Sequence, residues 1–318
     1  MLINNFQNLS GIEDAVKRRY LQYNESFVNA YKNYFLPFSS DSILAIIFYG
    51  SCLNDVTKKE SSTPDFFLIV KSYGAFHKNS IHSLLNRILT PNTYSINQGE
   101  LKGKYNVISL KDFQRETSPY AKDIYNLGRL SKRTAIIYSL DNEILNSVIK
   151  SIAKAYYTVA EKSFFLVPEK FRMAEFLDSC LRISYIGEKR VEADNKIEKL
   201  LKSEEKFYSL IYSLIIEDLI LEGALQKNRD DSFTKKIGLL REAFGSLRIK
   251  FFLRKSVIRA KMRWPKSIFT FKGWVDVLLA KIERTKGIKL NLTEKERRHP
   301  LIYGWKYYFR LKKDKIIK

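Results

Sequence analysis

The chain has 318 residues with an apolar content of 45%, enough for a sizeable core, and its length favours two domains with an appended segment. Its 56 Lys and Arg against 34 Asp and Glu give a net charge of +22, which predicts a polyanionic partner such as a phosphorylated substrate, an anionic membrane surface or nucleic acid. Two distant cysteines and three histidines without metal-ligand spacing argue against a disulfide scaffold and against a zinc site.

The first twenty residues predict neither a signal peptide nor a transit peptide, because they lack a basic-then-apolar order and they contain acidic side chains. Further along, no apolar run reaches the roughly 18–20 residues that a membrane-spanning helix needs. The sequence therefore predicts a protein that is soluble or peripherally attached to a membrane.

The first part of the chain reads as a mixed α/β sheet domain over residues 1–140. One or two amphipathic helices are expected over 7–36, where aromatic residues recur at spacings of three and four. Two buried strands follow at 43–48 and 66–70. The remaining expected elements are a helix over 75–89, a strand pair at 93–97 and 104–110, and a last strand over 133–140.

The rest of the chain reads as helical. A second domain is expected over 141–235, with the polar stretch 227–231 as a linker. The final segment, 236–318, is basic and aromatic, and from residue 251 onward 20 Lys and Arg stand against 5 Asp and Glu, a net charge of +15. Trp and Tyr beside Lys and Arg are typical of segments that meet anionic lipid. The same composition also suits nucleic-acid binding, or a helical tail that packs its aromatic residues inward.

The stretch Ile43–Val70 carries the strongest chemical signal. An apolar run ends in Tyr49-Gly50-Ser51, a polar loop follows, and Asp65 opens the second apolar run. Glycine lets backbone amides approach a phosphate closely, and the serine hydroxyl adds a hydrogen-bond donor. A carboxylate at the mouth of the second strand can hold a divalent cation that bridges phosphates. This arrangement predicts a nucleotidyltransferase-type site for a nucleoside triphosphate, with Asp65 as a ligand of Mg²⁺.

The acidic side chains of this site are few. An alternating acidic pair would need a second carboxylate at position 63 or 67, where Thr63 and Phe67 stand. Asp55, Glu60 and Glu100 are candidates for further ligands. This scarcity leaves open a catalytically inert lipid-binding or nucleic-acid-binding module on the same fold. The basic C-terminal segment leaves open a nucleotidyltransferase that acts on RNA or on a small molecule.

Several short motifs, in the same order along the chain, resemble one known family. Residues 103–109 (GKYNVIS) resemble a Lys-Tyr-Gly-Val-Ile strand, residues 127–132 (LGRLSK) an Ala-Gly-Arg-Leu-Gln-Lys segment, and residues 181–190 (LRISYIGEKR) a Ser-Tyr-Ser-Gly-Asp-x-Arg motif. These are motifs of the mitochondrial translocator assembly and maintenance family of phosphatidate cytidylyltransferases. Weaker matches are Phe76-His77, Tyr94 with Asn97, and Val257-Ile258-Arg259.

The resemblance covers about residues 45–260 and departs from the family pattern at two positions. Cys52 stands where the family has a second glycine, and Asn106 replaces the glycine of Lys-Tyr-Gly. The family consists of peripheral enzymes that make CDP-diacylglycerol. The resemblance therefore implies an α+β protein with a nucleotidyltransferase-type sheet domain, a helical domain and a basic helical C-terminal segment.

The resemblance also implies a reaction and a set of partners. The expected reaction transfers CMP from CTP to phosphatidate and releases pyrophosphate, in phospholipid biosynthesis, with Mg²⁺ as cofactor. The expected partners are CTP, phosphatidate and an anionic membrane surface, and nucleic acid is disfavoured. Because no transit peptide is expected, the sequence predicts a bacterial relative that is cytoplasmic and peripherally associated with the membrane.

The resemblance assigns roles to individual residues. Gly50 and Ser51 would cradle the triphosphate, Asp65 would bind the metal, and Lys104 would complete the catalytic set. The basic side chains of the motifs would neutralise the triphosphate or the phosphatidate headgroup, and an aromatic residue would hydrogen-bond the nucleotide or pack against it. These nucleotide- and phosphate-binding candidates are Arg129, Lys132, Arg190 and Tyr185.

Overall fold

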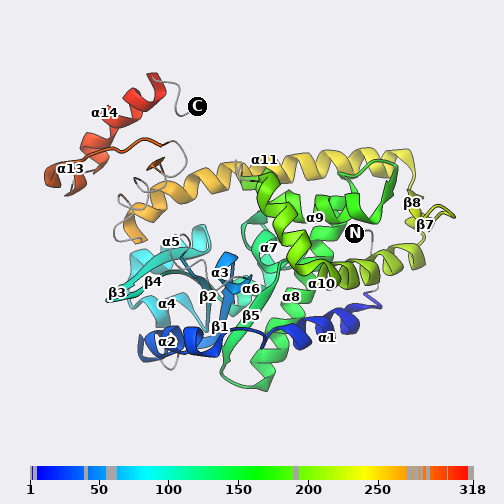
Figure 1. Ribbon diagram of the computed structural model, residues 1–318, viewed down its shortest axis with the longest axis horizontal. Coiled ribbons are helices and arrows are strands. Elements are labelled where there is room, and N and C mark those ends of the chain that lie inside the picture. Colours follow the sequence, from blue (N-terminus) through cyan, green and yellow to red (C-terminus); the bar gives the residue numbers. More distant parts are fainter. Residues whose placement is uncertain are drawn as a thin grey trace.

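The computed structural model describes residues 2, 6–38, 42–54, 63–188, 193–270, 275, 279, 282–283, 287–298 and 300–313. In this part of the chain a five-stranded sheet lies beside a group of helices, and a second, three-stranded sheet lies at the far end of that group (Figure 1). The expected α+β fold class is therefore confirmed.

The large sheet has the strand order β3-β4-β2-β1-β5. Strand β1 is antiparallel to β2 and to β5, β2 is parallel to β4, and β3 is antiparallel to β4. These pairings make a mixed sheet, as predicted, and every predicted strand is present, although β4 begins three residues before the predicted start at residue 104. The strands are β1 (Ile43–Tyr49), β2 (Asp65–Val70), β3 (Asn92–Gln98), β4 (Leu101–Ser109) and β5 (Thr134–Ser139).

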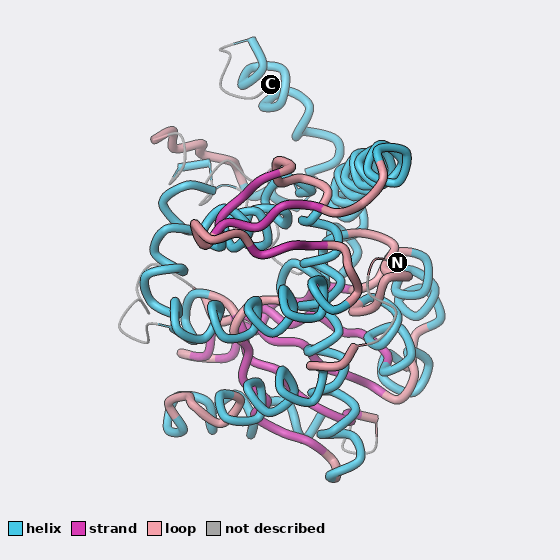
Figure 2. The backbone as a smooth tube through the Cα atoms, turned by 90° about the vertical axis from the view of Figure 1, so that its right-hand side faces the viewer, coloured by secondary structure: helices cyan, strands magenta, loops and turns pink. Residues whose placement is uncertain are grey.

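The two faces of this sheet are covered by different helices (Figure 2). One face, with Phe48 and Phe66, packs against α2 (Glu25–Phe35). The other, with Ile47 and Phe67, joins the core formed by the helices α1 (Leu9–Arg19), α7 (Ile124–Leu130) and α8 (Asn142–Phe164). Because side chains alternate along a strand, Asp65 lies on the same face as Phe67, which is the face toward α1, α7 and α8.

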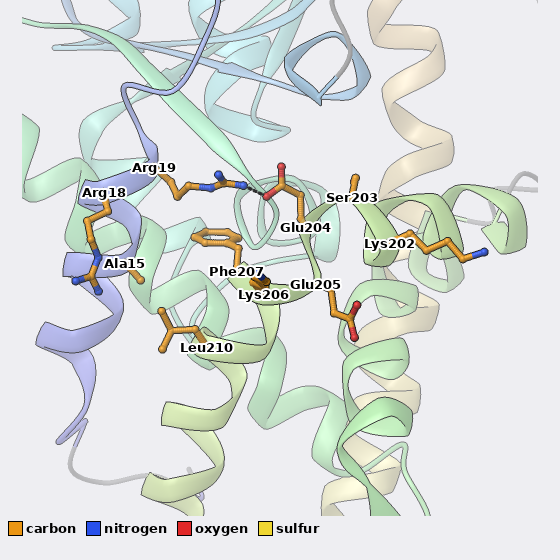
Figure 3. Close-up of a pocket in the computed structure, with 10 residues that line it drawn as sticks. All are labelled: Ala15, Arg18, Arg19, Lys202, Ser203, Glu204, Glu205, Lys206, Phe207 and Leu210. Carbon is orange, nitrogen blue, oxygen red and sulfur yellow. Dashed lines mark hydrogen bonds and ion pairs between the residues drawn. The ribbon is translucent and has the colours of Figure 1, made fainter.

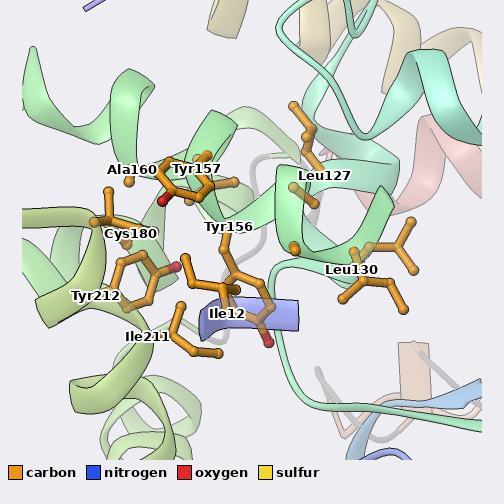
Figure 4. Close-up of a cluster of buried hydrophobic side chains, with 14 of the residues drawn as sticks. Ile12, Leu127, Leu130, Tyr156, Tyr157, Ala160, Cys180, Ile211 and Tyr212 are labelled. Carbon is orange, nitrogen blue, oxygen red and sulfur yellow. The ribbon is translucent and has the colours of Figure 1, made fainter. Parts of the chain in front are cut away.

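The helical core confirms that residues 141–226 are mainly helical. Its large side chains come from α1, α7 and α8, together with α9 (Met173–Glu188) and α10 (Ala193–Leu221), and interlock around a group of tyrosines (Figure 4). Tyr156, Tyr208 and Tyr212 are all buried in it. The structure does not test the predicted boundaries of three domains, but one hydrophobic cluster runs across the expected boundary at residue 140.

Two predictions about secondary structure are wrong. Residues 75–89 form two helices, α4 (Tyr73–His77) and α5 (Ser80–Ile88), because Lys78 is left-handed and the Asn79 side chain accepts hydrogen bonds from the first amides of α5. Residues 227–231 are not a linker, because they turn the chain between two short strands. These strands pair with a third to form the small sheet of β6 (Lys170–Arg172), β7 (Leu225–Lys227) and β8 (Ser232–Lys235).

The helix α11 (Leu239–Thr270) crosses the molecule above α7 and α9 and reaches the large sheet (Figure 1). It contacts α9 and α7 along its length and β3 and α5 near its end. The first part of the predicted C-terminal segment is therefore packed onto the body of the protein. The remaining elements are η1 (Leu36–Phe38), α3 (Ser51–Asn54), α6 (Leu110–Glu116), α13 (Glu294–Arg298) and α14 (Pro300–Lys313).

None of the helices in the described ranges combines the length and the apolar character that crossing a bilayer requires.

Candidate active site

The predicted Gly-Ser corner and the predicted metal ligand lie against each other. Gly50 follows β1 with a φ of +91°, a backbone conformation that favours glycine. A Cβ atom at this position would lie 3.2 Å from Asp65 Oδ2, so the glycine leaves room for the carboxylate. The ladder explains this contact, because Tyr49 is opposite Asp65 in the β1–β2 pair. Ser51 begins α3 and is exposed beside the corner.

Lys104 lies beside Asp65 on the same edge of the sheet. The two residues are opposite each other in the parallel β2–β4 ladder, and the Lys104 amide donates to the Pro64 carbonyl at 2.9 Å. Strand alternation places Lys104 on the same face as Asn106 and Ile108, which is the face toward α1, α7 and α8. The structure therefore brings Gly50, Asp65 and Lys104 together, although they lie on three different strands or strand ends.

Asn106 continues this polar strip and joins three other elements to it. Its Oδ1 accepts hydrogen bonds from the hydroxyls of Thr93 (2.6 Å) and Tyr125 (3.2 Å). Its Nδ2 donates to the hydroxyl of Tyr49 at 2.6 Å. Asn106 is 2% exposed, so these bonds satisfy a buried amide group. The side chain thereby connects β4 to β1, β3 and α7.

Arg129 lies at the α7–α9 interface and pairs with Glu188 at 2.5 Å. Its guanidinium also donates to the Tyr125 carbonyl at 2.8 Å and lies 3.5 Å from the centre of that ring. Burial alone would lower the pKa of Arg129, but the Glu188 carboxylate more than offsets this and raises it well above its ordinary value. Arg129 is therefore a fixed cation that is partly compensated inside the protein.

Lys132 and Tyr185 meet one turn further along the same interface. The Lys132 ammonium donates to Ser184 Oγ at 2.9 Å and lies 4.4 Å from the centre of the Tyr185 ring. Tyr185 is buried, so its ring packs against the lysine. The fourth basic candidate, Arg190, lies outside the described residues, as do the candidate carboxylates Asp55 and Glu60.

The α7–α9 interface that holds these cations depends on Gly128. A Cβ atom at Gly128 would lie 2.2 Å from the Cβ of Ser184, so any side chain forces the helices apart. We expect Gly128→Ala to lower the free energy of unfolding by about 1–3 kcal/mol, measured by urea denaturation. Gly74→Ala is the matched control, because nothing lies within 4 Å of the added methyl group and the stability should hold or rise slightly. Equal stability of both variants would contradict this packing argument.

Two arginines of α11 reach the same region from above. The Asp123 carboxylate caps α7 by accepting from the Tyr125 amide at 2.9 Å. It also accepts hydrogen bonds from Arg259 Nε at 2.5 Å and from the guanidinium Nη2 of Arg263 at 2.8 Å. Arg263 further donates to the Thr90 carbonyl at 2.8 Å, and its guanidinium lies 4.3 Å from the centre of the Tyr125 ring. Tyr125 is thus in contact with guanidinium groups from both α7 and α11.

His77, the histidine of the weaker Phe76-His77 match, is surrounded by hydrogen-bonding side chains. Its ring nitrogens lie 3.1 Å from the amide nitrogen of Asn86 and 3.3 Å from the hydroxyl of Tyr94. Burial, followed by the nearby His82 and Lys266, lowers the pKa of His77 to about 4. At neutral pH this ring is therefore an uncharged hydrogen-bonding group.

A metal would depend on few protein ligands. Within the described ranges, no three His, Cys, Asp or Glu side chains form a group that could hold an ion. Mg²⁺ commonly binds one or two carboxylates and completes its shell with substrate phosphates and water. Asp65, a partly buried carboxylate beside a glycine corner, fits this kind of shared site.

A groove of about 540 Å³ lies between α1 and the middle of α10 (Figure 3). Arg19 and Arg133 both pair with the buried Glu204, where α10 departs from helical geometry. Among the described residues that line the groove, none is a predicted site residue. We attribute its charged side chains to the packing of α1 against α10.

Sequence reasoning missed several residues around the site. Tyr49 and Asn106 lie inside the quoted motifs and on the same face as Asp65, so strand alternation could have drawn attention to them. Tyr125, Asp123 and Arg263 carry no local signal, because they meet only when α11 packs onto α7.

The chain is an α+β protein whose mixed sheet sets a glycine corner against a strand-opening carboxylate, beside the partly buried cations Lys104, Arg129 and Lys132, which is the arrangement that the sequence predicted for a nucleotidyltransferase-type site. The chain belongs to the family described as "Phosphatidate cytidylyltransferase, mitochondrial", whose sequence model matches residues 89–249. This confirms the resemblance found in the motifs. The matched region contains Lys104, Arg129, Lys132 and Tyr185, and it begins after the Gly50–Asp65 corner.

Two curated relatives carry the same name. The protein from Caenorhabditis briggsae is 25% identical over 205 residues, which cover 56% of this chain and 62% of the relative. The protein from Caenorhabditis elegans is 24% identical over 184 residues, covering 50% of this chain and 56% of the relative. The chain thus spans about three fifths of the curated relatives it matches. Both are named as mitochondrial, so they do not support the expected bacterial origin or a simply cytoplasmic location.

Proposed function

We propose that this protein is a phosphatidate cytidylyltransferase, which transfers CMP from CTP to phosphatidate to form CDP-diacylglycerol and pyrophosphate. The observation that carries the proposal is the position of the Asp65 carboxylate beside Gly50, in a chain of this family. Two curated relatives with this name add support.

The proposed reaction needs little acid or base catalysis from the protein. A phosphate oxygen of phosphatidate attacks the α-phosphorus of CTP, and the bond from that phosphorus to the β-bridging oxygen breaks. Pyrophosphate leaves with the electron pair. Because the attacking phosphate is already an anion near neutral pH, no general base has to remove a proton. Catalysis then consists mainly of positioning and of charge stabilisation.

The residues of the site divide this work. Gly50 and Ser51 would hold the triphosphate through backbone amides and a hydroxyl, and Lys104 would stabilise charge on the phosphates from the neighbouring strand. Arg129 and Lys132 would contribute positive potential from the helix side. Asp65 would hold Mg²⁺, which supplies charge neutralisation between the phosphates when it is bound.

An anionic membrane surface is the proposed partner because the acceptor is a lipid. Helix α11 exposes an apolar stripe, defined here as Leu240, Phe244, Leu247, Phe251, Ile258 and Met262, whose members are 54–77% exposed. Their spacing of three, four and seven places them on one side of the helix. Arg248, Lys250, Arg254 and Lys255 are exposed beside the stripe. An apolar stripe with basic flanks matches an anionic bilayer in both polarity and charge.

A prediction about membrane binding follows from the stripe. Phe244→Ser combined with Phe251→Ser should weaken association with phosphatidate-containing vesicles by about tenfold or more, because two large apolar side chains no longer enter the lipid. Vesicle co-sedimentation measures this. Leu21→Ser combined with Leu221→Ser, which changes exposed leucines outside α11, should leave binding unaltered. Equal binding by both double variants would show that the stripe does not meet lipid.

One assay separates the proposal from its alternatives. The purified protein is incubated with radiolabelled CTP, Mg²⁺ and phosphatidate vesicles, and label in the lipid fraction is measured. Labelled CDP-diacylglycerol is the expected result. Label transferred to tRNA or to a small molecule instead would favour a different nucleotidyltransferase. Absence of both transfer and Mg²⁺-dependent CTP binding would favour an inert binding module.

A further inference from the structure

We infer that Tyr125 and Asn106 are positioning residues of the proposed reaction, because together they connect helix α11 to the Gly50–Asp65 corner. This inference rests on the proposed function, which supplies the reaction whose rate it concerns. Neither residue is expected to contact the substrates. They would act through Tyr49, the residue that leads directly into the corner.

The connection begins at Asn106. Its side chain lies on the same face of the sheet as Asp65 and Lys104, two residues along β4 from the lysine. It is buried, and its amide binds the Tyr49 hydroxyl at 2.6 Å. Since Tyr49 immediately precedes Gly50 and is opposite Asp65, this bond fixes the end of β1 at the place where the chain turns into the corner.

The connection continues through Tyr125 to α11. The Tyr125 hydroxyl donates to Asn106 Oδ1 at 3.2 Å, next to the Thr93 hydroxyl at 2.6 Å, so these two hydroxyls together fix which way the amide of Asn106 faces. The ring itself is in contact with Arg129 and Arg263, whose guanidinium carbons lie 3.5 and 4.3 Å from its centre. Arg263 is anchored to Asp123 and to the Thr90 carbonyl. Tyr125 is therefore held on one side by its own helix and on the other by α11.

This arrangement differs from ordinary buried polar packing in where it ends. A hydrogen-bond network that serves only stability can lie anywhere in the core, and its loss changes the free energy of unfolding alone. This one ends at the residue before the phosphate-binding glycine and on the strand that carries Lys104. Displacements of about 1 Å in a site can cost about 10²-fold in rate. A loosened corner should therefore lower turnover while leaving ligand contacts in place.

The test removes single hydroxyl groups. Tyr125→Phe and Tyr49→Phe are each expected to lower kcat about tenfold and to leave the KM for CTP within about twofold, since no substrate contact is removed. The kcat of the double variant should be close to that of the less active single variant, because both hydroxyls act through Asn106. Tyr157→Phe is the matched control. Its hydroxyl donates to Asp218 at 2.5 Å in the helical core, and its removal should lower the melting temperature without changing kcat.

Each outcome decides the inference. If wild type is active and both Tyr125→Phe and Tyr49→Phe keep kcat within twofold, the network is structural and the inference is wrong. If Tyr157→Phe loses as much activity as they do, general destabilisation explains the loss and the inference again falls. If wild type itself makes no CDP-diacylglycerol, the proposed function fails and this inference fails with it. A loss of kcat in the first two variants alone supports it.

Discussion

Asp65→Asn is expected to lower the rate of CDP-diacylglycerol formation by about 10²–10³-fold. Asparagine keeps the size of the side chain beside Gly50 but removes the negative charge that would attract the metal. The loss should be seen as a fall in kcat, measured with phosphatidate-containing vesicles in the presence of CTP and Mg²⁺. Raising the Mg²⁺ concentration should restore part of the activity, because a larger fraction of the weakened metal site is then occupied.

The control for this experiment is Asp230→Asn, the same chemical change at an exposed position far from the site. Asp230 pairs with Lys170 beside the β7–β8 turn, and loss of such an exposed pair changes stability little. Melting temperatures of both variants should lie close to that of wild type. An Asp65→Asn protein that keeps half of the wild-type rate would remove the metal-binding role and, with it, the main support for the proposed mechanism.

The sheet and the corner could be predicted because their signals are local. Ile43–Tyr49 and Asp65–Val70 are apolar runs of strand length, and a glycine follows the first. The adjacency of Gly50 and Asp65 follows once the two strands pair. The split between α4 and α5 was missed because a short polar side chain, Asn79, stops one helix pattern and starts another. Strands of three or four residues, as in β7 and β8, are too short to show a period.

The side of the site that the helices form could not be predicted, because it depends on contacts between distant residues. Arg129 reads as a free phosphate-binding cation in its motif, but it pairs with Glu188, 59 residues away. Asp123 carries no signal in the sequence for its ion pair, because its partner Arg259 lies 136 residues further along the chain. Composition showed that the C-terminal segment is basic. It could not show that α11 uses some of that charge to bind the body of the protein.

Asp123→Ala is expected to lower the free energy of unfolding by about 3–5 kcal/mol, a large part of the stability of a typical protein. The change leaves the guanidinium groups of Arg259 and Arg263 without their carboxylate and removes the cap of α7. Urea denaturation measures the loss without adding salt. Asp141→Ala is the matched control, because Asp141 caps α8 at an exposed position, with a hydrogen bond of 2.7 Å to the Ile144 amide. Its loss should cost about 0.5–2 kcal/mol.

The dependence of this effect on pH separates the charge of Asp123 from its capping role. Burial by itself raises the pKa of Asp123, but Arg263 and Arg259 outweigh burial and bring the pKa below its ordinary value of 3.8. The stabilisation from this carboxylate is therefore complete above pH 3.8 and is lost as the pH falls through the lower, folded pKa. Asp123→Asn keeps the cap without the charge, so its urea midpoint should lie well below that of wild type at pH 7 and approach it in acid. A gap that stays constant down to pH 3 would mean that the arginines do not depend on the charge, and that α11 is held by its apolar contacts alone.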